Sequence, residues 1–383
     1  MKSFVKLVMI LLLSSCGLEQ TGTGLHSDAD GVWRGPSFGK HMSGTWYAAA
    51  LDYPEGYDWR SGYEDVECQI VMFADGVPVL KVPTGQQREI TADAQRIRIR
   101  SGHLYTDYTD GSETVIKKDG KEILRYEGGE EVVSLEVVDG AVHMLCMNTS
   151  TGGFVYRVDG RPAVARENGR LYGGLDVSDG HVGFCFANQS GHYRVSDGKV
   201  FLVDPDEDVT DVIDMRLCDG ELCMLIHTTG RSSPVMCIGD KRISDDYFES
   251  IDIASSRFLD TDSLCVRLRC RDGSSDLTSD MLWFGDGLSR RLRRVTQLLS
   301  VVVDDSGYHA VANPSEIQDG CIFSNRDKHE LPEDYYVYGD GCAVMREGTL
   351  YVGLTSGKGG KALIWKNGIL DTLKVNGPVI GLR

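Results

Sequence analysis

A short aromatic segment early in the chain carries the side chains best suited to chemistry. Residues 52–65 read DYPEGYDWRSGYED and include four aromatic side chains and one arginine that we assign to a candidate site: Tyr53, Tyr57, Trp59, Tyr63 and Arg60. Aromatic faces stack on sugar rings, and a neighbouring arginine donates hydrogen bonds to hydroxyl groups. This mixture predicts a ligand-binding surface suited to a glycan. The alternative is that the rings pack against the rest of the fold and hold the segment in place.

Two charged residues occupy positions where other copies of an internal repeat carry small residues. Asp107 and Arg267 stand where Ala49, Ala312 and Gly353 stand elsewhere in the repeat. A charged side chain at such a position must reach water or find a partner of opposite charge. We therefore expect these two residues to line the central channel of the fold. The alternative is that the fold tolerates both charges without using them.

Sequence patterns of familiar catalytic and metal sites are absent from the chain. There is no HExxH zinc motif and no Gly-x-Ser-x-Gly nucleophile turn. The acidic run 204–211 begins like a calcium-binding loop, but Val209 stands where such a loop needs glycine and Met215 where it needs glutamate. We therefore assign no catalytic residue, no metal site and no cofactor.

The charge balance limits the possible partners. The chain has 383 residues, of which 57 are acidic and 40 are basic, giving a net charge of −17. A protein that follows a nucleic-acid backbone needs a basic surface, so we exclude nucleic acid as a partner. The 45 glycines against 10 prolines favour a folded chain with many tight turns.

An internal repeat must position these residues. A turn followed by an alternating strand recurs eight times, beginning near residues 44, 102, 140, 180, 220, 262, 307 and 348. Later in most copies an Asp-Gly or Asn-Gly pair follows, at residues 75, 119, 159, 197, 286 and 367. Such pairs tolerate positive φ and mark two-residue β-hairpins. Each copy therefore predicts four short strands, in one case 132–138, 141–147, 153–158 and 161–166.

Four-stranded antiparallel units at this period predict an all-β fold, a β-propeller. One such sheet cannot bury both of its faces, whereas sheets stacked around an axis can. We expect eight blades, with seven as the alternative, in a single domain over residues 36–383. The first copy lacks a first strand before residue 44, so we expect the C-terminal segment 377–383 to supply it and close the ring.

The first residues read as an export signal. Lys2 and Lys6 precede an apolar stretch that is too short to span a bilayer, so residues 1–15 predict a signal peptide. The run Leu13-Ser14-Ser15-Cys16 resembles the bacterial lipobox, and this resemblance implies that Cys16 becomes the first mature residue and carries lipid. The alternative is an ordinary secretory signal. Residues 16–35 show little apolar periodicity and are expected to form a flexible tether.

The last repeat carries a second resemblance. Its segment Lys361-ALIWKNGILDTL resembles the Trp-Lys-Asn-Gly repeat of lipid-anchored β-propellers in gut Bacteroidota. The resemblance implies an outer-membrane lipoprotein that contacts the membrane through Cys16, on the periplasmic side or at the cell surface. We expect an envelope-anchored, non-catalytic binding or scaffold protein whose ligand is a glycan or a cell-envelope protein. The alternative is a carbohydrate-active hydrolase or lyase with its site on the loop face of the propeller.

Overall fold

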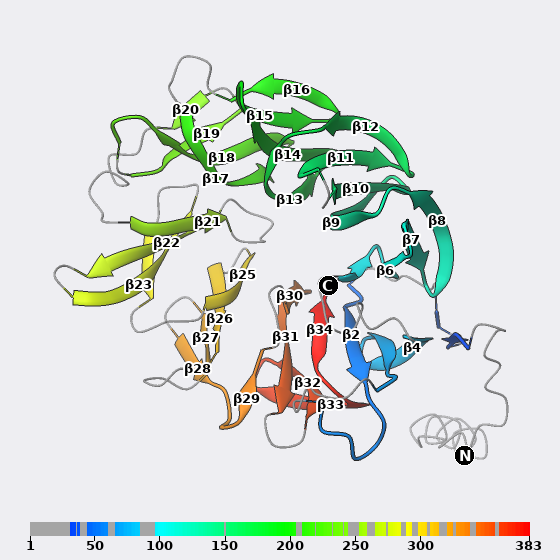
Figure 1. The fold of residues 1–383 in the computed structure, drawn as a ribbon. Coiled ribbons are helices and arrows are strands. Elements are labelled where there is room, and N and C mark those ends of the chain that lie inside the picture. Colours follow the sequence, from blue (N-terminus) through cyan, green and yellow to red (C-terminus); the bar gives the residue numbers. More distant parts are fainter. Residues whose placement is uncertain are drawn as a thin grey trace, which may run out of the picture.

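The chain folds into β-sheets. The computed structural model describes residues 31–35, 37–38, 44–59, 66–84, 96–148, 151–203, 209–218, 220–231, 233–239, 241–243, 253–258, 265–272, 275–284, 289–292, 298–304, 307–313, 320–324, 327–337, 342–356 and 360–383. Every regular element in these ranges is a strand, and the strands form eight antiparallel sheets. The sheets follow one another around a common centre (Figure 1). This confirms the predicted all-β fold of four-stranded antiparallel sheets.

Sheet 1 combines strands that are far apart in the sequence. Its order is β1-β4-β3-β2-β34. These strands are β1 (Trp33–Arg34), β2 (Tyr47–Asp52), β3 (Gln69–Ala74), β4 (Val77–Pro83) and β34 (Val379–Leu382). β34 pairs with β2, as expected for the C-terminal segment, and Ala48 lies opposite Leu382. β1 pairs with β4 and Val32 is 2% exposed, so the sheet begins within the segment 16–35 that was expected to be a tether.

Sheets 2 to 4 each contain four consecutive strands, ordered from the centre of the ring to its outer edge (Figure 1). Sheet 2 contains β5 (Ile97–Arg100), β6 (His103–Asp110), β7 (Glu113–Lys118) and β8 (Lys121–Glu127). Sheet 3 contains β9 (Glu130–Val138), β10 (Ala141–Asn148), β11 (Gly153–Val158) and β12 (Arg161–Arg166). Sheet 4 contains β13 (Arg170–Ser178), β14 (His181–Asn188), β15 (Gly191–Ser196) and β16 (Lys199–Leu202).

Sheets 5 to 7 repeat this order, and sheet 8 differs in its inner strand. Sheet 5 contains β17 (Val209–Cys218), β18 (Glu221–Thr228), β19 (Val235–Ile238) and β20 (Lys241–Ile243). Sheet 6 contains β21 (Ile253–Phe258), β22 (Cys265–Asp272), β23 (Ser275–Phe284) and β24 (Ser289–Leu292). Sheet 7 contains β25 (Leu298–Asp304), β26 (Gly307–Ala312), β27 (Cys321–Ser324) and β28 (Asp327–Glu330). Sheet 8 contains β29 (Tyr335–Tyr336), β30 (Ala343–Arg346), β31 (Thr349–Ser356), β32 (Lys361–Lys366) and β33 (Ile369–Asn376), and both β29 and β30 pair with β31.

The predicted Asp-Gly hairpins join the third and fourth strands of several sheets. Asp119, Asp159 and Asp197 have φ angles of 51°, 48° and 48°, which this turn type requires. The carboxylate then reaches back to the second strand, where Asp159 Oδ1 accepts a hydrogen bond from Val142 N at 2.9 Å. Asp159 N donates to Val142 O, also at 2.9 Å. One residue thus fixes both the turn and its position relative to the second strand.

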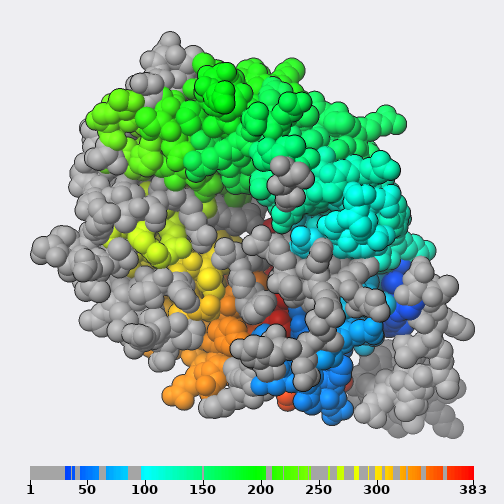
Figure 2. All heavy atoms as spheres, in the orientation of Figure 1, coloured from blue at the N-terminus to red at the C-terminus, as the bar shows by residue number. Residues whose placement is uncertain are grey.

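The core lies between neighbouring sheets. In sheets 3 and 4, Phe154, Phe184 and Phe186 are fully buried, and the ring centroids of Phe154 and Phe186 are 5.0 Å apart. Each such side chain contributes about 1.5–3 kcal/mol through burial. Nine of the ten cysteines that the structure describes are buried in the same way. Figure 2 shows sheets 3 to 5, in green, as one continuous surface on the face in view. The described ranges contain no helix long and apolar enough to cross a membrane.

Candidate functional site

The aromatic segment leaves β2 and crosses to sheet 8. Tyr57 N donates to Pro54 O at 3.1 Å, which folds the segment into a turn. Asn376, the last residue of β33, holds this turn: its side-chain amide donates to Pro54 O at 2.9 Å and to Tyr57 O at 3.2 Å. Asn376 N donates to Asp52 Oδ1 at 2.9 Å. The first part of the segment is therefore tied across the junction of sheets 1 and 8.

Three of the predicted site residues lie in this tied part. The rings of Tyr53 and Tyr57 have centroids 5.4 Å apart and planes inclined by 34°. The indole N–H of Trp59 donates to Gly360 O at 3.2 Å. All three side chains are half-buried. The segment packs against the fold, as the alternative interpretation held, and its rings still keep part of their surface exposed. Their role in ligand binding stays a prediction.

A glycine makes the position of Trp59 possible. Gly360 has φ 63°, and a Cβ added there would lie 2.5 Å from Trp59 Nε1. Real side chains do not tolerate such a contact, so any larger residue would displace the indole. Glycine at this position therefore allows the tryptophan to rest directly on the backbone that precedes β32.

The far end of the segment returns to sheet 1 at Cys68. Cys68 N donates to Thr84 Oγ1 at 3.3 Å, and Thr84 Oγ1 donates to Cys68 O at 2.7 Å. Burial raises the pKa of the Cys68 thiol to about 11, so the thiol stays protonated at neutral pH. Arg60 and Tyr63, the other two candidate site residues, lie outside the described residues.

The structure gives both Asp107 and Arg267 a partner of opposite charge, and their place in a channel stays a prediction. Asp107 on β6 is 1% exposed and forms an ion pair with Arg98 on β5. Arg267 on β22 pairs with Asp280 on β23 at 2.6 Å, and its guanidinium donates to Leu298 O in sheet 7 at 3.1 Å. A charge inside a protein needs such a partner to offset its lost hydration. Each charge therefore has a partner within its own sheet, and the guanidinium of Arg267 also contacts sheet 7.

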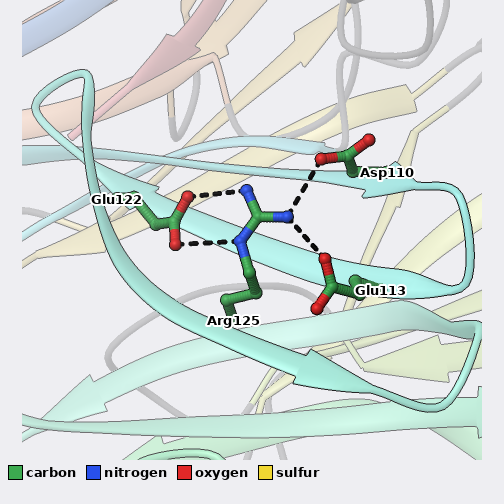
Figure 3. Close-up of polar contacts among 4 residues, drawn as sticks. All are labelled: Asp110, Glu113, Glu122 and Arg125. Carbon is green, nitrogen blue, oxygen red and sulfur yellow. Dashed lines mark hydrogen bonds and ion pairs between the residues drawn. The ribbon is translucent and has the colours of Figure 1, made fainter.

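An exposed ion-pair cluster joins strands β6, β7 and β8 of sheet 2 (Figure 3). Arg125 Nη1 lies 2.9 Å from Asp110 Oδ2 and 2.7 Å from Glu113 Oε2, and Glu122 bonds to the guanidinium from the other side at 2.8 and 3.0 Å. Hydrogen bonds from Arg125 lower the pKa of Glu122. Exposed pairs of this kind contribute little to stability. Within the described ranges, no three His, Cys, Asp or Glu side chains are placed so that they could hold a metal ion.

A hollow of about 850 Å³ opens between sheets 4 and 5, and sequence reasoning did not find it. Its lining comes from β15 and from two hairpins of sheet 5: Arg194, Ser196, Gly220, Glu221, Leu222, Ile238, Gly239 and Lys241. These residues are spread over almost fifty positions and form no recognisable motif. Only the side-by-side packing of the two sheets brings them together.

Comparisons with known proteins find distant structural likenesses alone. No protein-family profile and no curated protein matches the chain. One similar solved structure is the beta-propeller domain of the Trilobed protease from Pyrococcus furiosus, with 10% identity over 74% of this chain and 91% of that chain, and a TM-score of 0.42. The fold class follows from the arrangement of the eight antiparallel sheets around one centre (Figure 1). The chain is a β-propeller.

Two other structures resemble this propeller at similar levels. TolB from Acinetobacter baumannii is 13% identical, over 88% of this chain and 82% of that chain, with a TM-score of 0.35. A quinonprotein alcohol dehydrogenase-like protein from Bacteroides thetaiotaomicron is 11% identical, over 88% of each chain, with a TM-score of 0.36. These likenesses concern the fold alone.

Proposed function

We propose that this propeller is an envelope-anchored, non-catalytic binding lipoprotein that holds a glycan on the segment 53–59. The observation that carries the proposal is the placement of Tyr53, Tyr57 and Trp59, whose half-buried rings lie on a segment tied by Asn376 and supported at Gly360. Rings fixed in advance lose little conformational freedom when a sugar stacks on them. The segment therefore has the chemistry and the order that glycan binding requires.

The proposal includes an anchor at Cys16 and an outer-membrane location. The net charge of −17 means that anionic lipid surfaces repel the chain, so acyl chains on Cys16 must hold it at the membrane. We also propose that the eight sheets are eight blades, with β34 closing the ring. Labelling cells with a palmitate analogue tests the anchor: the wild type takes up label and Cys16→Ser does not. Label on Cys16→Ser would refute the anchor.

The glycan is tested by a binding screen with the mature protein in mild detergent. Host, dietary and envelope glycans are screened for binding and for release of sugar, using the wild type, Trp59→Ala and Tyr193→Ala. Tyr193 is a matched control because it is also a half-buried aromatic residue but lies on β15, in sheet 4. Loss of binding with Trp59→Ala alone supports the proposal.

Three other outcomes contradict it. Release of sugar by the wild type would refute the non-catalytic function and favour a hydrolase or lyase. Equal loss of binding in both variants would mean that Trp59 acts only through folding. Absence of binding to every glycan would refute a glycan ligand and favour a cell-envelope protein in its place.

A further inference from the structure

The outer strand of sheet 4 differs from most other outer strands. β12, β20, β24 and β28 read RPAVAR, KRI, SRRL and DKHE, with charges or a proline that discourage the addition of a further strand. β16 reads KVFL, and its three apolar side chains, Val200, Phe201 and Leu202, are 36%, 40% and 43% exposed. This strand therefore presents an apolar edge with one charge.

The backbone of β16 is suited to accepting a strand. Val200 lies opposite Val195 and Leu202 opposite Tyr193, while Val203 N donates inward to His192 O at 2.9 Å. Inward and outward N–H groups alternate along an antiparallel strand, so the N–H groups of Val200 and Leu202 point outward. None of the described strands pairs with this outer edge.

Sheet 1 shows that an outer strand of this fold can carry one more strand. There β1 pairs with β4, with Trp33 opposite Lys81 and Arg34 opposite Leu80. The added strand is only two residues long and makes sheet 1 five-stranded. A segment of another protein can extend sheet 4 in the same way.

The charges beside β16 indicate what kind of segment fits. The guanidinium of Arg194 lies 4.8 Å from the centroid of the Phe201 ring, and Arg194 and Lys241 both line the hollow between sheets 4 and 5. Lys199 adds a third cation opposite Ser196, against two carboxylates: Glu221 in the lining, and Asp197 in the adjoining hairpin, which bonds to His181. In a chain of net charge −17 this local excess of positive charge favours an acidic partner.

We propose that β16 binds an extended segment of a partner protein as a fifth strand of sheet 4. Apolar residues of the partner lie beside Val200 and Leu202, and its acidic residues lie on the side of Lys199, Arg194 and Lys241. A second copy of this chain fits less well, because a second β16 strand, KVFL, carries a lysine and no acidic residue. The proposal does not depend on the glycan site, which lies at sheets 1 and 8.

The test uses capped synthetic peptides and the mature protein in mild detergent. An eight-residue peptide that alternates glutamate with valine is compared with one that alternates lysine with valine. Binding is measured by fluorescence anisotropy, and hydrogen exchange is followed at Val200 and Leu202. We expect the acidic peptide to bind and to slow exchange at both amides, and the basic peptide to bind at least about tenfold more weakly.

Four variants separate strand addition from unspecific attraction. Val200→Pro removes only an outward N–H and Leu202→Ser removes apolar contact, so each is expected to weaken binding about tenfold. Val200→Ala keeps the N–H and should bind better than Val200→Pro. Ile123→Ser is the matched control, since Ile123 is 39% exposed on the outer strand β8. It should bind as the wild type does.

Three results would overturn the proposal. The first is equal binding by Val200→Pro and the wild type. The second is failure of the acidic peptide to bind or to protect the two amides. The third is a dimer that forms without peptide and is lost in Val200→Pro, because the edge then serves a second copy. Trp59→Ala should bind the peptide normally, which keeps this test separate from that of the glycan.

Discussion

Replacing Asp107 by alanine tests whether its charge has a structural role. Asp107 is 1% exposed and its partner Arg98 is 8% exposed, so alanine leaves a buried guanidinium without this carboxylate. Removing one partner of a buried ion pair costs about 3–5 kcal/mol. Arg96, which lies 3.9 Å from Asp107, still has Glu131 at 3.7 Å, so most of the cost arises at Arg98. We expect a fall of this size in the free energy of unfolding.

Urea unfolding followed by circular dichroism measures the effect. The matched control is Asp110→Ala: the Asp110 side chain is 59% exposed and Arg125 keeps Glu113 and Glu122, so the cost should be below about 1 kcal/mol. The double variant Arg98→Met with Asp107→Leu should recover most of the lost stability, because it removes both charges of this buried pair. An equal effect of Asp107→Ala and Asp110→Ala, or no recovery in the double variant, would refute the reasoning.

Three further outcomes are expected. In urea unfolding, Asp159→Ala should cost about 1–2 kcal/mol, because Val142 N loses its acceptor and alanine resists φ 48°, while Asp159→Asn should be nearly neutral. Burial lowers the pKa of His143, so the unfolded chain binds a proton at this residue more readily than the folded chain does. The free energy of unfolding should therefore fall as pH drops through 6.5. Urea melts at several pH values should show a smaller fall for His143→Gln. Gly360→Ala should weaken glycan binding as much as Trp59→Ala, measured in the same screen, because its Cβ would displace the indole. Three results would contradict these expectations. They are equal unfolding free energies for Asp159→Ala and Asp159→Asn, the same pH dependence for His143→Gln as for the wild type, and wild-type glycan binding by Gly360→Ala.

The fold could be predicted because its strongest signals are local. An Asp-Gly pair sets its own φ angles and hydrogen-bonds within the same sheet, so the turn at Asp159 can be recognised from two residues. Strand alternation is equally local, and the strands predicted at 132–138 and 141–147 are observed as β9 and β10, extended by two residues and one residue. The same turn and strand pattern recurs along the chain, so each copy of the repeat supports the strands predicted for the others.

The surroundings of the site could not be predicted, because they depend on distant residues. Asn376 hydrogen-bonds to the carbonyl groups of Pro54 and Tyr57, which lie more than 300 positions earlier in the sequence. No sequence pattern links these residues. The partner of Asp107 is only nine positions away, but the strand register does not reveal it. Arg98 on β5 lies opposite Tyr105 on β6 and reaches Asp107 diagonally. Alternation predicts which face a residue occupies, but not which neighbour on that face it contacts.

The pairing of β34 with β2 has a consequence for biosynthesis. Sheet 1 takes strands from residues 33–83 and from residues 379–382, so a nascent chain cannot complete it until the last of these residues leaves the ribosome. Until then β2 has an uncovered inner edge, and residues 97–376 are synthesised meanwhile. A polypeptide whose first sheet is finished last cannot reach its complete fold before translation of these residues ends.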